Sequence, residues 1–384
     1  MINLITELSL YLHLPFCKHK CYYCDFNSFS GKDELMPDYA DALISEMQSF
    51  LPQSPLIKSV YFGGGTPSYF STELLVHLIQ FIKEHFFINA FTEVTIEANP
   101  GTVHFKDLIR FHEAGFNRLS LGLQATQDQL LQVIGRIHTW QDFLTSYKQA
   151  RESGYTNIGV DLIFGLPGQT IEAWQDSLER VTALKPEHIS AYGLQLEPRT
   201  KLAALVEHGS LKLPSEDDVC AMMQRTMDYL RDNGYEHYEI SNFAKPGFHS
   251  IHNTGYWSGR NYLGFGAGAS STYHQDRWVN ITDPGAYIQV QKNRISAVAS
   301  LEVIDHTIAI TEAVMLGLRM RKGIDLAQFQ ASFQIALADQ AADELARLTK
   351  QELLRVQDGR LLLTDRGVLL SNYVIASLLA KLEE

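Results

Sequence analysis

Short apolar runs alternate with longer amphipathic stretches over the first 200 residues of this chain. The apolar runs predict six strands, at 8–14, 59–62, 94–98, 118–124, 158–164 and 188–196. The stretches between them predict helices at 39–50, 72–86, 105–114, 140–153 and 171–184. This order favours an α/β fold with a parallel sheet and crossover helices. A partial (β/α)6 barrel suits the regular alternation at least as well as an open doubly wound sheet, and the pattern alone does not choose between them.

The alternation stops near residue 200. A predicted helix at 216–233 is followed by an aromatic, glycine-rich stretch at 235–278, where glycines at 264, 266 and 268 indicate close backbone packing. Helical periodicity returns at 310–318 and 337–348, and Asp358-Gly359 between two alternating arms predicts a hairpin. Thr364 is the expected cap of a last helix through Leu382. We therefore predict a barrel at 1–200, its extension at 201–300, and a small winged-helix-like α+β module at 301–384. A generic α+β cap fits the third pattern equally well.

Charge and hydropathy exclude several classes of partner. Lys and Arg number 32 against 44 Asp and Glu, a net charge of −12. With no basic block to offset it, a nucleic-acid partner is not expected. No apolar run approaches the roughly 18 residues that a membrane-spanning helix needs. The first residues lack the basic start and cleavage site of a signal peptide. We expect an unprocessed cytoplasmic protein with at most peripheral membrane contact.

Three of the four cysteines, Cys17, Cys21 and Cys24, fall within eight residues. So few cysteines in a long chain indicate metal binding rather than a disulfide framework. Zinc would need a fourth ligand, from His13 or His19. An iron–sulfur cubane held by three thiolates would keep one iron open for another ligand. Spacing alone leaves these two alternatives nearly even, with buried structural thiols as the third. Cys220 lies in a helical stretch and is expected to pack in the core.

Glycines and polar residues gather where the predicted strands end. Gly63, Gly64, Gly65 and Thr66 follow the second strand, where glycines either let the backbone approach a ligand or make a tight turn. The later positions are Glu97, Gln124, Arg136 and Asp161. Because barrel strands end at one face, these residues should share a mouth with the cysteines. They suit a cationic amino acid that carries a ribose, with Asp161 accepting from sugar hydroxyls and Glu97 facing the positive group. Singly, each has an ordinary structural explanation.

The cysteine spacing, with Tyr23 before the last cysteine, resembles the signature of radical S-adenosylmethionine enzymes. The resemblance implies that the three cysteines hold a [4Fe–4S] cluster whose fourth iron is chelated by S-adenosylmethionine. From Tyr11-x-His13-x-Pro15-Phe16-Cys17 onward, nearly the whole chain is similar to the branch that contains oxygen-independent coproporphyrinogen oxidase and the haem chaperone HemW. That branch implies S-adenosylmethionine contacts for Tyr11, Tyr23, Gly63, Gly64, Gly65, Thr66, Glu97, Gln124, Arg136 and Asp161.

Two departures separate the chain from the oxidase. The oxidase has a further cysteine where Phe26 stands, and a longer segment than the sixteen residues that precede Cys17 here. In His252-Asn253-Thr254-Gly255-Tyr256-Trp257, a neutral imidazole can ligate haem iron and aromatic rings can pack on a large planar ring. Taken alone, a histidine beside aromatic residues is more often a core residue. The string is similar to the H-N-x-x-Y-W motif of the chaperones, which implies haem binding by His252, Asn253, Tyr256 and Trp257.

We therefore expect a haem chaperone that binds haem as cargo, a [4Fe–4S] cluster and S-adenosylmethionine. The resemblance implies delivery of haem to haem-dependent respiratory proteins, an electron donor to the cluster and a cluster-dependent homodimer. The rival is a coproporphyrinogen oxidase, in which a radical derived from S-adenosylmethionine abstracts hydrogen from a porphyrinogen propionate. A third alternative is a zinc-stabilised binding protein. No catalytic residue beyond the cofactor ligands is identified.

Overall fold

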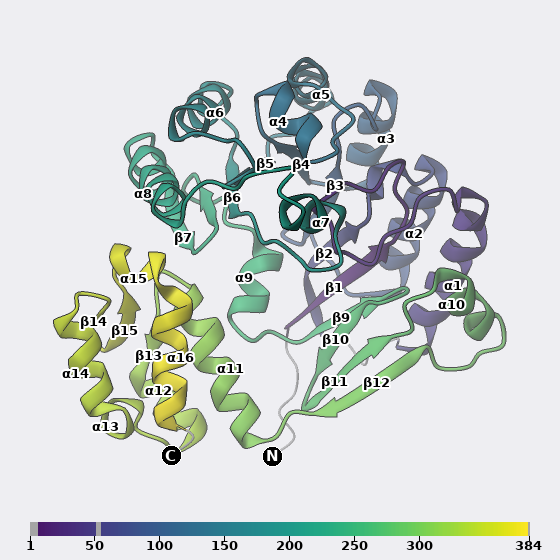
Figure 1. Cartoon of the computed structure of the whole chain (residues 1–384). Coiled ribbons are helices and arrows are strands. Elements are labelled where there is room, and N and C mark those ends of the chain that lie inside the picture. Colours follow the sequence, from purple (N-terminus) through teal and green to yellow (C-terminus); the bar gives the residue numbers. More distant parts are fainter. Residues whose placement is uncertain (1–6, 51–54, 383–384) are drawn as a thin grey trace.

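The computed structural model describes residues 7–50 and 55–382, so the first six residues of the expected unprocessed N-terminus lie outside it. Six strands form the middle of a twelve-stranded sheet and pair in parallel in chain order (Figure 1). They are β1 (Glu7–Leu14), β2 (Leu56–Gly64), β3 (Glu93–Ala98), β4 (Arg118–Gln124), β5 (Ile158–Phe164) and β6 (His188–Gly193). The predicted α/β fold with a parallel partial barrel is confirmed.

Helices cover the outer face of these strands (Figure 1). They are α1 (Met36–Ser49), α2 (Thr72–His85), α3 (Phe105–Ala114), α4 (Asp128–Val133), α5 (Trp140–Glu152) and α6 (Ile171–Ala183), with short 3-10 turns at Asp33–Leu35 and Pro67–Tyr69. In β1, Leu8, Leu10, Leu12 and Leu14 are fully buried in the hydrophobic core. Because strand side chains alternate between faces, the intervening residues point to the inside of the barrel.

The inside of the barrel is polar. The strand register aligns Tyr11 with Tyr61, Glu97 with Ser120, and Asp161 with Ser190. Each of these residues is at an alternate position of its strand, on the face opposite the apolar core. The alternation therefore places the functional side chains inside, at the carboxyl ends of the strands.

Later strands extend both ends of the sheet. β9 (Tyr262–Phe265) pairs in parallel with β1 and is followed by antiparallel β10 (Ser270–Tyr273), β11 (Asp276–Asn280) and β12 (Val298–Val303). At the opposite end, β8 (Asn242–Ala244) and β7 (Glu236–Glu239) follow β6. The helices of this region are α7 (Lys201–Glu207), α8 (Glu216–Asp232), α9 (Ile251–Trp257) and α10 (Pro284–Lys292). The predicted packing of the 264–268 glycines is borne out at Gly266, where a Cβ would lie 2.6 Å from the carbonyl oxygen of His13.

The C-terminal part of the chain forms a separate three-stranded sheet packed with helices (Figure 1, yellow-green to yellow). Its elements are α11 (His306–Arg319), β13 (Ile324–Asp325), α12 (Leu326–Phe333), α13 (Leu337–Gln340), α14 (Ala342–Lys350), β14 (Leu354–Gln357), β15 (Arg360–Leu363), α15 (Asp365–Leu369) and α16 (Ser371–Leu382).

Two details of this C-terminal part were predicted correctly from the sequence, and two expected helices differ. Asp358 and Gly359 both have positive φ, as the predicted two-residue hairpin turn requires. Thr364 caps α15 by accepting from the amide of Gly367, but the expected last helix is divided into α15 and α16. The helix expected over 337–348 is likewise divided at Ala341. In the described ranges, no helix is both long and apolar enough to cross a membrane.

Candidate functional site

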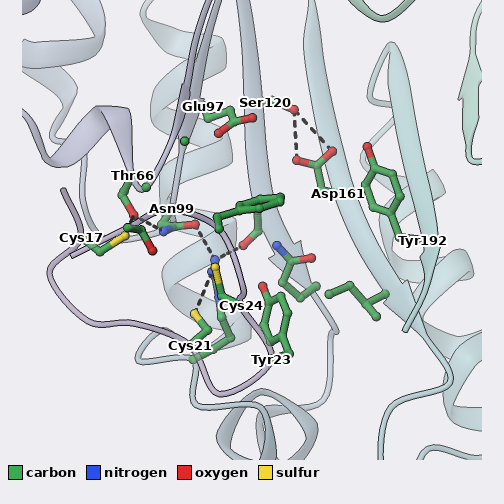
Figure 2. A pocket seen from close by; sticks show the side chains of 18 of the residues that line it. Cys17, Cys21, Tyr23, Cys24, Thr66, Glu97, Asn99, Ser120, Asp161 and Tyr192 are labelled. Carbon is green, nitrogen blue, oxygen red and sulfur yellow. Dashed lines mark hydrogen bonds between the residues drawn. The ribbon is translucent and has the colours of Figure 1, made fainter. Parts of the chain in front are cut away.

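A cavity of about 530 Å³ opens at the carboxyl ends of the barrel strands (Figure 2). The structure brings most of the sequence-predicted residues onto its wall, namely Cys17, Cys21, Tyr23, Cys24, Gly64, Gly65, Thr66, Glu97, Gln124, Arg136 and Asp161. Tyr11 and Gly63 are not part of this wall. Asn99, Arg118, Ser120 and Tyr192 are among the further residues that line the cavity and were not singled out from the sequence.

The cysteine loop is fixed at both ends by backbone hydrogen bonds. The amide of Cys17 donates to the carbonyl oxygen of Phe29 at 2.8 Å, and the amide of Phe29 donates to that of Pro15 at 2.7 Å. The Thr66 hydroxyl donates to Cys17 Sγ at 3.5 Å. Burial raises the pKa of the Cys17 and Cys24 thiols. These thiols are therefore neutral unless a bound positive charge, such as that of iron, stabilises the thiolates.

The donor set suits a cluster better than a single ion. Among the described residues, no three His, Cys, Asp or Glu side chains lie close enough together to hold one metal ion. His13, which the zinc alternative could use, already bonds Tyr11 through Nδ1 (3.0 Å) and the carbonyl oxygen of Asn27 through Nε2 (2.8 Å). Zinc gathers its ligands within about 2.3 Å of one centre. In a cubane each thiolate binds a different iron, so the sulfur atoms lie further apart. The geometry therefore disfavours zinc.

The cysteine loop packs closely against the glycine run. A Cβ on Gly65 would lie 2.7 Å from the carbonyl oxygen of Phe16 and 3.0 Å from Cys17 Sγ. Gly64 has φ +112°, and a Cβ there would lie 2.7 Å from the His13 ring. The Gly65 amide also donates to the carbonyl oxygen of Leu14 at 2.9 Å. Only glycine fits at 64 and 65 without moving the loop.

Arg136 is half-buried and directed towards the cysteines, not exposed on the surface. Its Nη2 donates to Asn99 Oδ1 at 2.6 Å and to the carbonyl oxygen of Gly122, and its Nη1 donates to Cys21 Sγ at 3.5 Å (Figure 2). Asn99 in turn donates from Nδ2 to Thr66 Oγ1 at 2.8 Å. Asn99 thus connects the glycine segment to Arg136. The sequence signal for Asn99 was its position two residues after Glu97.

Two partly buried carboxyl groups, those of Glu97 and Asp161, face the same cavity. Burial raises the pKa of Glu97 to about 7, although the Tyr61 hydroxyl donates to its Oε1 at 2.7 Å. Burial also raises the pKa of Asp161, which accepts from the Ser120 hydroxyl at 3.1 Å. The charge of Arg118 lowers the pKa of both carboxyl groups, but by less than burial raises it. The cavity therefore offers two acceptor groups to a cationic ligand with hydroxyl groups.

His252 lies on α9, against the outside of this cavity. Its ring stacks on Tyr61 at 4.8 Å between centroids. Its Nδ1 lies 2.9 Å from the Ser59 hydroxyl, and its Nε2 lies 3.0 Å from the Tyr256 hydroxyl. Because Ser59 donates its proton to Ser9 Oγ, it accepts from Nδ1, and the Nε2 lone pair accepts from Tyr256. Burial lowers the pKa of His252 to about 3, so the imidazole is neutral.

A second cavity of about 250 Å³ adjoins the first. His252, Asn253, Tyr256 and Trp257 all line it, together with Tyr11. Four residues line both cavities, namely Tyr61, Glu97, Tyr192 and Asn253. The structure thus gathers the predicted haem residues on one wall beside the predicted cofactor site. The residue assignments to S-adenosylmethionine and haem stay predictions.

Cys220 was expected in the core, and this was wrong. It lies on α8 and is exposed, whereas Met222, Met223 and Met227 form the buried face of that helix. Helical periodicity explains the error, because residues two positions apart on a helix point in different directions.

The chain is similar in sequence and in structure to known proteins. Residues 11–181 match the Radical SAM superfamily, and residues 304–370 match the HemN C-terminal domain. The chain is 37% identical to the haem chaperone HemW of Lactococcus lactis over 97% of both chains. It is 36% identical to that of Bacillus subtilis, covering 97% of this chain and all of the relative. The solved structure of Escherichia coli coproporphyrinogen III oxidase (HemN) superposes with a TM-score of 0.85 at 26% identity, covering 97% of this chain and 90% of that one.

Proposed function

Because the chain belongs to the HemW branch of the radical S-adenosylmethionine superfamily, we propose that it is a haem chaperone. It binds haem as cargo, carries a [4Fe–4S] cluster and S-adenosylmethionine, and delivers haem to haem-dependent respiratory proteins from the cytoplasm. The proposal includes an electron donor to the cluster and a homodimer that forms with it. One observation carries it: the neutral His252 lines a cavity with aromatic walls, where its Nε2 accepts a hydrogen bond from the Tyr256 hydroxyl.

The larger cavity supports the cofactor part of the proposal. Cys17, Cys21 and Cys24 would each give one thiolate to the cluster, and the fourth iron would be left for S-adenosylmethionine. Thr66 and Arg136 donate hydrogen bonds to the sulfur atoms of Cys17 and Cys21, which stabilises negative charge on sulfur. A reduced cluster with S-adenosylmethionine supplies one electron for cleavage of the sulfonium. Glu97 and Asp161 offer carboxylates to the positive charge and the ribose.

The smaller cavity supports the cargo part. Haem iron accepts a neutral imidazole nitrogen, and a ligating histidine usually donates its other ring N–H to a neighbouring acceptor. The Ser59 hydroxyl is such an acceptor for His252 Nδ1. Nε2 becomes available once the Tyr256 hydroxyl turns away from it. The proposal thus requires a local side-chain movement of Tyr256, which remains close to the bound ring.

The overall likeness to HemN keeps coproporphyrinogen oxidation as the second candidate. Phe26 argues against it. This residue is 63% exposed and lines the larger cavity, where a phenyl ring supplies no sulfur ligand or thiol chemistry. Both candidates use the same cofactor residues, so only the fate of the tetrapyrrole distinguishes them.

The test is an anaerobic titration of reconstituted protein with haem, followed by absorbance, for wild type and His252→Ala. His237→Ala is the matched control, because His237 is also neutral and stacked, on Phe243 at 4.2 Å, but lines neither cavity. Coproporphyrinogen and a reductant are then added and the products analysed. We expect stoichiometric haem binding that weakens only in His252→Ala, with unchanged iron and sulfide, and no decarboxylated product. Decarboxylation without specific haem binding would establish the oxidase instead.

A further inference from the structure

The smaller cavity is completed by a residue from the C-terminal part of the chain. Arg319, the last residue of α11, lines it together with His252. Backbone hydrogen bonds fix this position: the Ile240 amide donates to the carbonyl oxygen of Arg319 at 3.1 Å, and the Arg321 amide donates to that of Tyr238 at 3.0 Å. Figure 1 shows α11 beside α9. The guanidinium is therefore held at the cavity wall by the junction between the C-terminal part and the barrel.

The guanidinium of Arg319 is only loosely paired. Its Cζ lies 4.2 Å over the Trp257 ring, and its Nη2 lies 3.4 Å from Oε2 of the buried Glu239. Charge-assisted hydrogen bonds of this kind are usually about 2.7–2.9 Å long. The Glu239 carboxylate takes its other hydrogen bonds from the Ser241 amide, at 3.0 Å, and from the Asn242 side chain. Glu239 therefore orients the Arg319 guanidinium but leaves other N–H donors of that guanidinium without a partner.

Two N–H donors at this wall have no acceptor. Arg319 Nε and Trp257 Nε1 are both buried and form no hydrogen bond within the described part of the chain. Leaving a buried donor unpaired costs about 1–3 kcal/mol. Both atoms are covered by their neighbours, and the two side chains stack on each other, so one ligand oxygen group would reach both donors once the stacked pair shifts towards the cavity. The wall therefore favours a ligand with acceptor oxygens at this point.

The other side chains that line the smaller cavity indicate what kind of molecule would carry these acceptor oxygens. Its wall is rich in aromatic rings, from Tyr11, Tyr61, Tyr192, Tyr256 and Trp257. Arg319 is the cation among the residues that line it, and Glu97 and Glu239 are the carboxyl groups. Aromatic rings pack well against a flat ring system, and a guanidinium recognises carboxylates. These features suit a planar molecule that bears a carboxylate on its edge.

We propose that Arg319 binds a propionate carboxylate of haem while His252 faces the iron. This inference rests on the proposed function and extends it, because it gives the C-terminal part of the chain a direct role in holding the cargo. The propionate accepts from the guanidinium and from Trp257 Nε1, and Glu239 keeps Nη2 in place. The site is then made jointly by α9 of the extension and α11 of the C-terminal part.

The experiment compares haem with haem dimethyl ester, in which both carboxylates are blocked, on the full-length reconstituted protein. The variants are Arg319→Met, which removes the charge, and Arg319→Lys, which keeps it. Arg347→Met is the matched control: Arg347 also lies over an aromatic ring, Tyr373, and pairs with a carboxylate, Glu344 at 2.5 Å, but lines neither cavity. Trp257→Phe removes Nε1–H and keeps a ring, so it serves as a second test if Arg319→Met fails to fold.

We expect Arg319→Met to weaken haem binding about tenfold or more, as for the loss of a hydrogen bond to a charged group. It should leave binding of the ester unchanged, and Arg319→Lys should recover part of the loss. Trp257→Phe should likewise weaken binding of haem more than of the ester, and Arg347→Met should change neither. Equal losses for haem and ester would assign Arg319 a packing role and overturn the inference. If wild type binds neither ligand, the proposed haem-binding function itself fails.

Discussion

The Tyr61 hydroxyl donates a 2.7 Å hydrogen bond to Oε1 of Glu97, in the wall that the two cavities share. The ring of the same tyrosine stacks against His252, with 4.8 Å between centroids. One side chain of β2 therefore contacts both a carboxyl group predicted to meet S-adenosylmethionine and the histidine predicted to meet haem. The two predicted sites are in direct physical contact, so a ligand that moves Tyr61 in one site alters the other.

The first prediction concerns the pH dependence of S-adenosylmethionine binding. Burial raises the pKa of Glu97 from its usual 4.5 to about 7, and the carboxylate attracts a cationic cofactor only when ionised. Affinity should therefore rise with pH, about tenfold between pH 6 and pH 8, and level off above that range. Calorimetric titration of the reconstituted protein measures it. Nearby Asp161 and Arg118 are present in every variant and do not change the comparison.

Glu97→Gln should remove most of this rise, leaving the titration of Asp161, whose pKa burial also raises, and that of the cofactor itself. Glu84→Gln, at an exposed position on α2, is the control and should keep the wild-type profile. Equal slopes in wild type and Glu97→Gln would show that Glu97 does not face the positive charge.

The second prediction concerns the ligands of the cluster. Cys17→Ala, Cys21→Ala and Cys24→Ala should each lose the cluster, because two thiolates do not readily hold a cubane. Iron and sulfide content and visible absorbance after anaerobic reconstitution measure the loss. Cys220→Ala should keep the cluster, because Cys220 is exposed on α8 and does not line the cavity. A colourless wild-type protein with bound zinc, or loss of the cluster in Cys220→Ala, would contradict the assignment.

The third prediction tests the close packing of Gly65 against the cysteine loop. Gly65→Ala should lower cluster occupancy severalfold and leave the fold intact, because its Cβ would press on Phe16 O and on Cys17 Sγ. Iron content per chain, with circular dichroism as the check on folding, measures the effect. Gly285→Ala is the control, since a Cβ there would meet only Asp283 Oδ1, at 3.2 Å. Full occupancy in Gly65→Ala would mean that the loop shifts freely.

The central barrel could be predicted because its signals are local. β4 and β5 cover the predicted ranges, since continuous apolar runs between amphipathic helices are typical of buried parallel strands. The short strands β7, β8 and β9 were not predicted. β8 and β9 hold as strands because they pair with the edge strands β6 and β1 of the barrel, and β7 pairs with β8. A four-residue stretch such as Tyr262–Phe265 carries no such signal in its own sequence.

In the candidate site, too, some residues could be predicted from local sequence and others could not. Motifs identified the cysteines, the glycine run and His252. Each of these motifs consists of residues that are close together in the sequence. Asn99 and Arg319 belong to no motif, and their role depends on what the fold brings next to them. The motif also could not show that both ring nitrogens of His252 are already bonded, because Ser59 and Tyr256 come from different elements.

The last prediction concerns Glu46, which connects α1 to the extension. Its carboxyl group accepts from the Gly266 amide at 2.8 Å and from the Tyr287 hydroxyl and Asn280 Nδ2, both at 2.6 Å. Glu46→Ala leaves these three buried donors without their acceptor. We expect it to lower the free energy of unfolding by about 2–4 kcal/mol at pH 5, measured by urea denaturation.

The same substitution should cost less at pH 8. Burial raises the pKa of Glu46 from 4.5 to about 7 in the folded state, so the folded protein binds more protons than the unfolded chain between these values. The stabilising contribution of Glu46 is therefore complete below pH 4.5 and declines as the pH rises through 7. Glu113→Ala, at an exposed position on α3, should have little effect at either pH. A loss that is larger at pH 8 than at pH 5 would mean that the hydrogen-bond donors around Glu46 outweigh its burial and hold it ionised.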